Sequence, residues 1–130
     1  MSQDWALSNG YFFETVVTVE NRGTAAVLIP PHDYVVGAAT PMDRYDMAEV
    51  QGAYWFNGEK AEQINKPWFA NATLGCSTIS TPRSEFAGGN SNVVWAAVHN
   101  QFFALIAQPD QSPAGVRVVD IPLPAPSPSE

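Results

Sequence analysis

Two histidines are the side chains best suited to acid–base catalysis near neutral pH, and they stand in different contexts. His32 follows Pro30-Pro31 and precedes Asp33, so a His–Asp pair for general-base catalysis is one interpretation. A surface turn is the other interpretation, since prolines favour a bend at this point. His99 lies at the end of an apolar run, a position typical of a histidine at a sheet edge or in a core. We therefore predict no catalytic residue and no enzymatic activity.

Three carboxylates stand three residues apart at Asp43, Asp46 and Glu49. On one face of a helical turn they could attract Ca²⁺. However, the spacing lacks the alternating oxygen ligands and the central glycine of a calcium loop. A solvated face is the preferred interpretation, and we predict no metal site.

Aromatic residues form the best candidate for ligand binding. Trp55, Trp68 and Phe69 could present a sugar-stacking platform, as in carbohydrate-binding modules, and we take Trp55, Trp68 and His32 as weak ligand candidates. The opposing interpretation places the aromatic rings in a core, because each ring buries a large apolar area.

Short motifs and the single cysteine add little chemistry. The sequence contains none of the glycine-rich phosphate loops, serine nucleophile elbows or HExxH zinc motifs, so we predict no cofactor. Cys76 is alone and is interpreted as a buried structural thiol, because it can form neither an internal disulfide nor a CxxC site. Asn71-Ala72-Thr73 matches the glycosylation sequon, a pattern short enough to arise by chance.

Composition excludes several functional classes. The 130 residues are 45% hydrophobic and 15% charged, with a net charge of −7 and a pI near 4.6. Such an acidic surface repels phosphate backbones, so we predict no nucleic-acid partner. The 11 prolines and 9 glycines interrupt the chain too often for a helical bundle. No run reaches 18 apolar residues, so we predict no transmembrane helix.

Alternating hydrophobicity predicts the first strands. In residues 11–20, Tyr11, Phe13, Thr15, Val17 and Val19 share one face of a half-buried strand. A turn at 21–24 and a returning strand at 25–29 follow, which Pro30-Pro31 ends.

The next region contains the clearest hairpin signal. Residues 53–56 and 59–64 flank Asn57-Gly58, the dipeptide favoured in a type I′ turn. Residues 42–50 are either a short helix or a loop containing one turn. Residues 67–69 and 71–80 continue with a β-like pattern.

The last part of the chain leaves one ambiguity. Residues 93–107 fit a helical stripe and also fit two strands broken at Asn100-Gln101. Residues 116–121 read as a final strand. Many short strands and turn signals predict an all-β antiparallel β-sandwich over residues 1–121, followed by a Pro/Ser-rich linker at 122–130.

The stretch from Trp95 to Phe103 (WAAVHNQFF) resembles the W-x-A/G-x-x-N/H-Q-F/Y-F stretch of the periplasmic domain in the YidC family of bacterial membrane protein insertases. Upstream, residues 11–23, 28–30, 35–38 and 55–59 are similar to the order of strands and turns in that domain. The resemblance covers about residues 9–124, and it matches the C-terminal part of the family's domain.

The resemblance implies a galactose-mutarotase-like β-supersandwich, in which residues 93–107 would be strands. It assigns Trp95, Asn100, Phe102 and Phe103 to a structural core. It also implies a non-catalytic interaction domain at the periplasmic face of the bacterial inner membrane, in a parent protein that inserts and folds membrane proteins. Its expected partners are the Sec translocon or nascent membrane proteins.

Two alternatives stay open at this point. The first is a carbohydrate-binding or carbohydrate-modifying β-sandwich, because a fold does not decide a function. The second is a domain with an exposed sheet edge, which would favour a homodimer.

Overall fold

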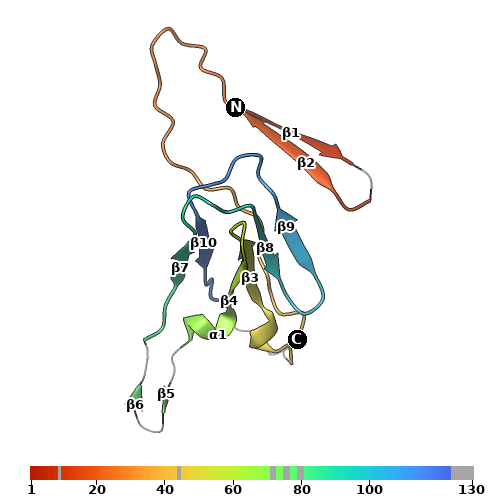
Figure 1. The fold of residues 1–130 in the computed structure, drawn as a ribbon, viewed down its shortest axis with the longest axis vertical. Helices are drawn as coiled ribbons and strands as arrows, with labels where there is room; N and C mark the ends of the chain where they lie inside the picture. Colours follow the sequence, from red (N-terminus) through yellow and green to blue (C-terminus); the bar gives the residue numbers. More distant parts are fainter. Residues whose placement is uncertain (9, 44, 71–72, 75–76, 79–80, 124–130) are drawn as a thin grey trace. The chain divides into compact units, whose positions relative to one another are not determined.

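The computed structural model describes residues 1–8, 10–43, 45–70, 73–74, 77–78 and 81–123. The chain is nearly all β, with antiparallel sheets in a sandwich-like arrangement, as predicted. It divides into two units, Met1–Asp33 and Tyr34–Glu130. Figure 1 shows their strands.

The first unit contains one hairpin. Strand β1 (Ser2–Leu7) pairs antiparallel with β2 (Phe13–Thr18), with Ser2 opposite Thr18 and Leu7 opposite Phe13. Because directly opposed residues share a face, Trp5, Leu7, Phe13 and Val17 gather on one side. The strand predicted at residues 11–20 is therefore confirmed over residues 13–18, as β2. Its apolar face is largely exposed within this unit.

The partner of β2 differs from the prediction. Residues 25–29 were expected to form the returning strand, but they form no strand, and the partner is β1. The turn itself forms, because the Asn21 side chain accepts a hydrogen bond from the Gly23 amide at 2.9 Å and donates one to the Ala25 carbonyl at 2.8 Å. The two prolines that follow supply no amide donors for a ladder.

The second unit is built on a four-stranded antiparallel sheet in the order β4-β3-β8-β9. Its strands are β3 (Gly52–Phe56), β4 (Ala61–Asn65), β8 (Trp95–His99) and β9 (Ala104–Ala107). The hairpin predicted around Asn57-Gly58 is confirmed as β3–β4. Residues 93–107 contain two strands broken at 100–103, so the strand interpretation is correct and the helical one is wrong.

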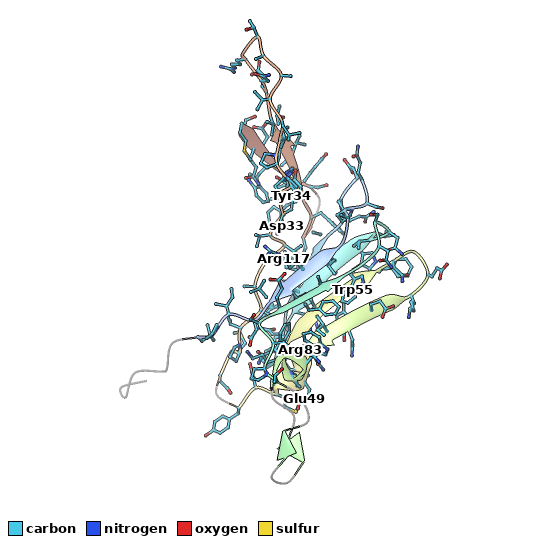
Figure 2. The ribbon with its side chains drawn as sticks, turned by 90° about the vertical axis from the view of Figure 1, so that its left-hand side faces the viewer. Asp33, Tyr34, Glu49, Trp55, Arg83 and Arg117 are labelled. Atoms are coloured by element: carbon cyan, nitrogen blue, oxygen red, sulfur yellow. The ribbon has the colours of Figure 1, made fainter. Side chains whose placement is uncertain are left out.

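A second layer comes from β7 (Glu85–Gly88) and β10 (Val116–Val119), which pair antiparallel. The core between the layers consists of buried Trp55, Ile64, Phe69 and Val93, and Phe86, Val116 and Val118 pack against it. The Trp55 and Phe86 ring centroids are 5.4 Å apart. Figure 2 shows Trp55 among the strands of this unit. This two-layer packing makes the unit sandwich-like.

Short elements complete the second unit. They are a 3₁₀ turn, η1 (Ala48–Val50), one helical turn, α1 (Lys66–Phe69), and the paired two-residue strands β5 (Thr73–Leu74) and β6 (Ser77–Thr78). The described residues of the 42–50 stretch are thus a loop with one turn. The β-like pattern predicted for 67–69 is wrong, because Pro67 near the start of a helix favours the helical φ. Residues 35–38, matched to a strand by resemblance, form none.

Several predictions fall wholly or partly outside the described residues, among them the β-like stretch at 71–80, of which only 73–74 and 77–78 are described. The others include Cys76, the sequon at Asn71-Ala72, and residues 124–130 of the expected linker. Within the described residues, no helix has both the length and the apolar character needed to cross a bilayer.

Candidate functional site: an aromatic surface on the four-stranded sheet

The two faces of the four-stranded sheet have different environments. Trp55 points toward the β7–β10 layer, so its neighbours Tyr54 and Phe56 point to the opposite side, because successive strand residues alternate. The register places Tyr54 opposite Ala97, and Ala97 opposite Ile106. We call the side that carries Tyr54 the outer face.

Two stacked aromatic pairs lie on the outer face. The Tyr54 and His99 rings stack with centroids 4.6 Å apart and an interplanar angle of 25°. The Phe56 and Trp95 rings are 6.1 Å apart at 17°. Phe56 and Trp95 are directly opposed in the ladder, whereas Tyr54 and His99 are diagonal neighbours. Cross-strand aromatic pairs of this kind stabilise a sheet and leave ring surface available to a ligand.

The β8–β9 turn adds two further rings to this face. Asn100 Oδ1 accepts hydrogen bonds from the amides of Phe102 and Phe103, both at 2.9 Å, and the Asn100 amide donates to the Phe103 carbonyl at 2.9 Å. This network fixes the turn. The Phe102 and Phe103 side chains are 61% and 66% exposed.

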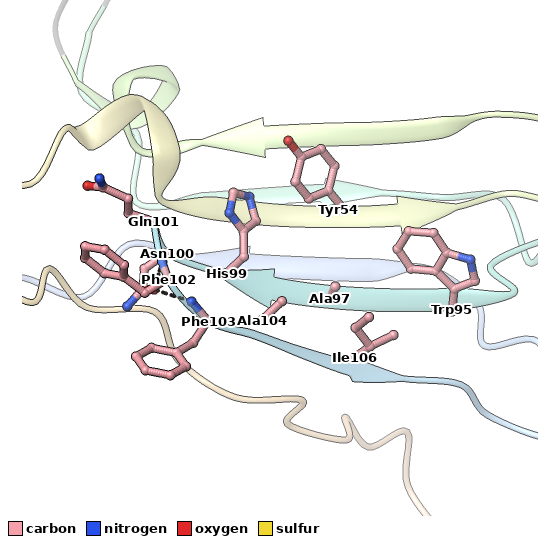
Figure 3. A pocket seen from close by; sticks show the side chains of 10 residues that line it. All are labelled: Tyr54, Trp95, Ala97, His99, Asn100, Gln101, Phe102, Phe103, Ala104 and Ile106. Atoms are coloured by element: carbon pink, nitrogen blue, oxygen red, sulfur yellow. Dashed lines mark hydrogen bonds between the residues drawn. The ribbon is translucent and has the colours of Figure 1, made fainter. Parts of the chain in front are cut away.

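These groups surround a cavity of about 400 Å³, drawn in Figure 3. Five rings line it together with two side-chain amides and three aliphatic groups: Tyr54, Trp95, His99, Phe102, Phe103, Asn100, Gln101, Ala97, Ala104 and Ile106. We call the six rings Tyr54, Phe56, Trp95, His99, Phe102 and Phe103 the aromatic surface.

The lining of the cavity contains no Asp, Glu, Lys or Arg. Charged pairs lie elsewhere in the described part of this unit, such as Lys60 Nζ and Glu62 Oε1 at 2.7 Å on β4 and the adjoining turn. The hydrogen bond and negative charge of Glu62 raise the pKa of Lys60 above its ordinary value. The aromatic surface therefore suits apolar or aromatic groups that also accept or donate a hydrogen bond to an amide.

The structure revises the predicted ligand candidates. Trp55 is only 6% exposed, so the core interpretation is correct and Trp55 cannot stack on a sugar. Trp68 is half-buried, with its ring edge-on to Phe86 and the Arg83 guanidinium 4.3 Å from its centroid; Figure 2 marks Arg83.

His32 belongs to the first unit, whereas both tryptophans belong to the second. His32 is exposed, and its Nδ1 donates to the Pro30 carbonyl at 3.1 Å. The surface part of the prediction is therefore confirmed, but no turn forms at residues 30–33. His99, expected at an edge or in a core, is half-buried on the outer face of a central strand.

The core positions that the resemblance implied for the residues of the WAAVHNQFF stretch need a larger correction. Phe102 and Phe103 were expected in the sandwich core, but both are exposed, and Trp95 is only partly buried. The physical reason is that the core forms on the side of Trp55, while Trp95 lies on the other side of the sheet. Asn100 keeps a structural role through its turn network. Trp95, Asn100, Phe102 and Phe103 all line the cavity.

Two of the three carboxylates considered for a cation site, Asp43 and Asp46, make local hydrogen bonds. Asp43 accepts a hydrogen bond from the Tyr45 amide, and Asp46 accepts one from the Met42 amide. Within the described part of the chain, no group of three or more His, Cys, Asp and Glu residues could hold a metal ion.

Sequence reasoning missed Tyr54, Phe56 and Ile106 as surface residues. Alternation in β3 was the available signal, because it places Tyr54 and Phe56 on the side opposite Trp55. Comparison with protein-family models, curated proteins and solved structures found no match to this chain.

Proposed function

We propose that this chain is a non-catalytic interaction domain that docks other polypeptides on its aromatic surface. The main observation behind this proposal is the presence of two stacked aromatic pairs, Tyr54–His99 and Phe56–Trp95. They lie beside the exposed rings of Phe102 and Phe103. Large exposed apolar patches are typical of protein interaction sites. Aromatic residues provide much contact area at little cost in conformational entropy.

The parent activity that we propose is membrane protein insertion. The support is the WAAVHNQFF stretch, which resembles the periplasmic domain of the YidC insertase family, together with the all-β fold. The ring and amide side chains of this stretch line the cavity. In this proposal the domain lies at the periplasmic face of the inner membrane and contacts the Sec translocon or nascent membrane proteins.

The expected docking chemistry follows from the lining. A passing apolar segment would place its side chains on the rings, while the Gln101 amide at the rim offers hydrogen bonds to its backbone. Gln101 and Phe102 are exposed at the β8–β9 turn, where a partner can reach them. The neutral lining suits apolar segments, because a charged side chain would lose its hydration there without gaining an ion pair.

Site-specific photocrosslinking tests this proposal. Phe102 is replaced by p-benzoylphenylalanine, and the purified chain is irradiated with a detergent extract of bacterial inner membranes. Tyr45, also an exposed aromatic residue of the second unit, is replaced in the control. We expect translocon components or membrane proteins in the products from position 102 and at least fivefold less from position 45. Equal products from both positions, or no second protein, would refute the docking role.

A carbohydrate-binding domain is the second candidate function. The neighbouring Asn100 and Gln101 amides beside open rings favour it, because sugars combine an apolar face with hydroxyl groups. Titration with hexoses and short oligosaccharides tests it through tryptophan fluorescence. A saturable change that Trp95→Phe abolishes and Trp5→Phe retains would establish this function in place of polypeptide docking.

A further inference from the structure

Strand β9 occupies one edge of the four-stranded sheet. The Asn100 amide donates to the Phe103 carbonyl at 2.9 Å, which marks these two residues as a hydrogen-bonded pair. Such pairs alternate along an antiparallel ladder, so Leu105 and Ala107 direct their backbone groups toward β8. The amides and carbonyls of Ala104 and Ile106 therefore point away from the sheet, along its free edge.

The β9 edge lacks the features that usually prevent edge-to-edge pairing, which are charges, prolines and bulges. Its sequence is ALIA, its register with β8 is continuous, and Leu105 and Ile106 are 52% and 62% exposed. Every other edge strand of four or more residues in the described part of the chain contains a charged residue: Asp4 in β1, Glu14 in β2, Glu62 in β4, Glu85 in β7 and Arg117 in β10.

A neighbouring segment lies beside β9 without pairing with it: Ala38 and Ala39 line a hollow together with Ala104 and Leu105. Residues near Gly37 pack against the side chains of Leu105 and Val98, on the same side of the sheet as the core. The Asn100 side chain donates to the Thr40 carbonyl at 3.1 Å. In the part of the chain that the structure describes, no hydrogen bond joins this segment to the backbone of Ala104 or Ile106.

We propose that β9 pairs antiparallel with β9 of a second copy of this chain, independently of the insertase proposal. Ala104 then lies opposite Ile106 of the second copy, and Leu105 lies opposite its own counterpart. In this register, the outward amide and carbonyl of Ala104 in each copy form hydrogen bonds with those of Ile106 in the other copy. The two sheets form one continuous eight-stranded sheet, in which both cores remain on the same side.

The distribution of charge favours β9 as the place where a second copy pairs. Each copy carries a net charge of −7, so two copies repel each other overall, and a contact surface without carboxylates adds least to this repulsion. The 24 residues from Phe86 to Pro109 contain no Asp, Glu, Lys or Arg, and this stretch includes both β8 and β9. The β9 edge is therefore the place where two acidic copies can meet with the least repulsion.

Sedimentation equilibrium of the full chain over about 1–200 μM tests the proposal, because weak dimers have dissociation constants in the micromolar range. We expect a species of twice the 14.1 kDa chain mass. Ala104→Pro removes an outward amide without removing a hydrogen bond to β8, and Ile106→Lys adds a charge to the edge. Each should raise the dissociation constant at least tenfold while the near-ultraviolet circular dichroism is retained.

Val119→Lys is the matched control, since Val119 is an exposed residue in the edge strand β10, and it should leave the dissociation constant within twofold. The register is tested in a Cys76→Ser background, where Leu105→Cys should form an intermolecular disulfide and Val119→Cys should not. A wild-type chain that stays monomeric to the highest concentration overturns the proposal. So does a dimer that neither edge substitution weakens, or one that Leu105→Cys fails to crosslink.

Discussion

Two glycines of the second unit hold a positive φ in different surroundings. Gly58 has a φ of +92°, and a Cβ built there would meet Val94 Cγ2 at 3.9 Å, an ordinary contact. Gly89 has a φ of +87°, but its Cβ would lie 2.9 Å from Val93 Cγ2 and 3.0 Å from Gly115 Cα. Val93 is the most buried residue of the core, so it has little room to move.

Alanine substitutions should separate backbone strain from crowding. Gly58→Ala is expected to lower the free energy of unfolding by about 1 kcal/mol, the cost of a left-handed L residue. Gly89→Ala adds overpacking and should cost about 2–4 kcal/mol in total. Urea unfolding followed by tryptophan fluorescence measures both values. Equal losses would show that the contact of Gly89 with Val93 and Gly115 does not constrain the fold.

At the scale of elements, both hairpins of the four-stranded sheet are closed by an asparagine. Asn57 Oδ1 accepts hydrogen bonds from the amides of Glu59 and Lys60, both at 2.9 Å. Asn100 Oδ1 accepts hydrogen bonds from the amides of Phe102 and Phe103. Only Asn100 uses its Nδ2 group as well, to hold Thr40, as far as the hydrogen bonds of the described residues show. Asn100 thus connects the β8–β9 turn to the segment that packs beneath β9.

Substitution by aspartate should separate these two tasks. Asn100→Asp retains the acceptor for the turn amides and loses the donor to Thr40, so residues 34–43 should exchange their amide hydrogens severalfold faster, while residues 102–103 stay protected. The cost in stability is expected at about 0.5–1.5 kcal/mol. Hydrogen exchange with mass spectrometry measures the effect, and Asn57→Asp is the control. Unchanged exchange at 34–43 would contradict this role of Asn100.

Charge is the whole-molecule property with the clearest consequence. The net charge of −7 opposes association of two copies, although the proposed contact at β9 is neutral. Added salt screens this repulsion, because the Debye length falls from about 30 Å at 0.01 M to about 10 Å at 0.1 M ionic strength. Raising NaCl across this range should therefore lower the dimer dissociation constant severalfold, as measured by sedimentation. Weaker association at high salt would indicate a contact made by opposite charges instead.

Local signals in the sequence were sufficient for several elements. Asn57-Gly58 between two apolar runs predicted the β3–β4 hairpin, because the turn and its strands are contiguous. The turn type differs, however, from the predicted type I′, which requires a positive φ at both central residues. Gly58 has a positive φ, but Asn57 does not, because Ser91 is the one described non-glycine residue with a positive φ. Asn57 instead closes the loop with its side chain. Alternation likewise predicted β2, but it placed the partner at residues 25–29 instead of β1.

Pairing between distant segments determines the secondary structure where the local sequence pattern fits both a helix and a strand. Residues 95–99 fit a helix or a strand, and they are a strand because they pair with β3, about 40 residues earlier. The surface role of Phe102 and Phe103 has a similar origin. Both faces of β8 are mainly apolar: Trp95 and Ala97 lie with His99 on one face, and Ala96 and Val98 lie on the other. Alternation defines these two faces, but the β7–β10 layer covers only the face of Ala96, and no local pattern specifies which face a distant layer will cover.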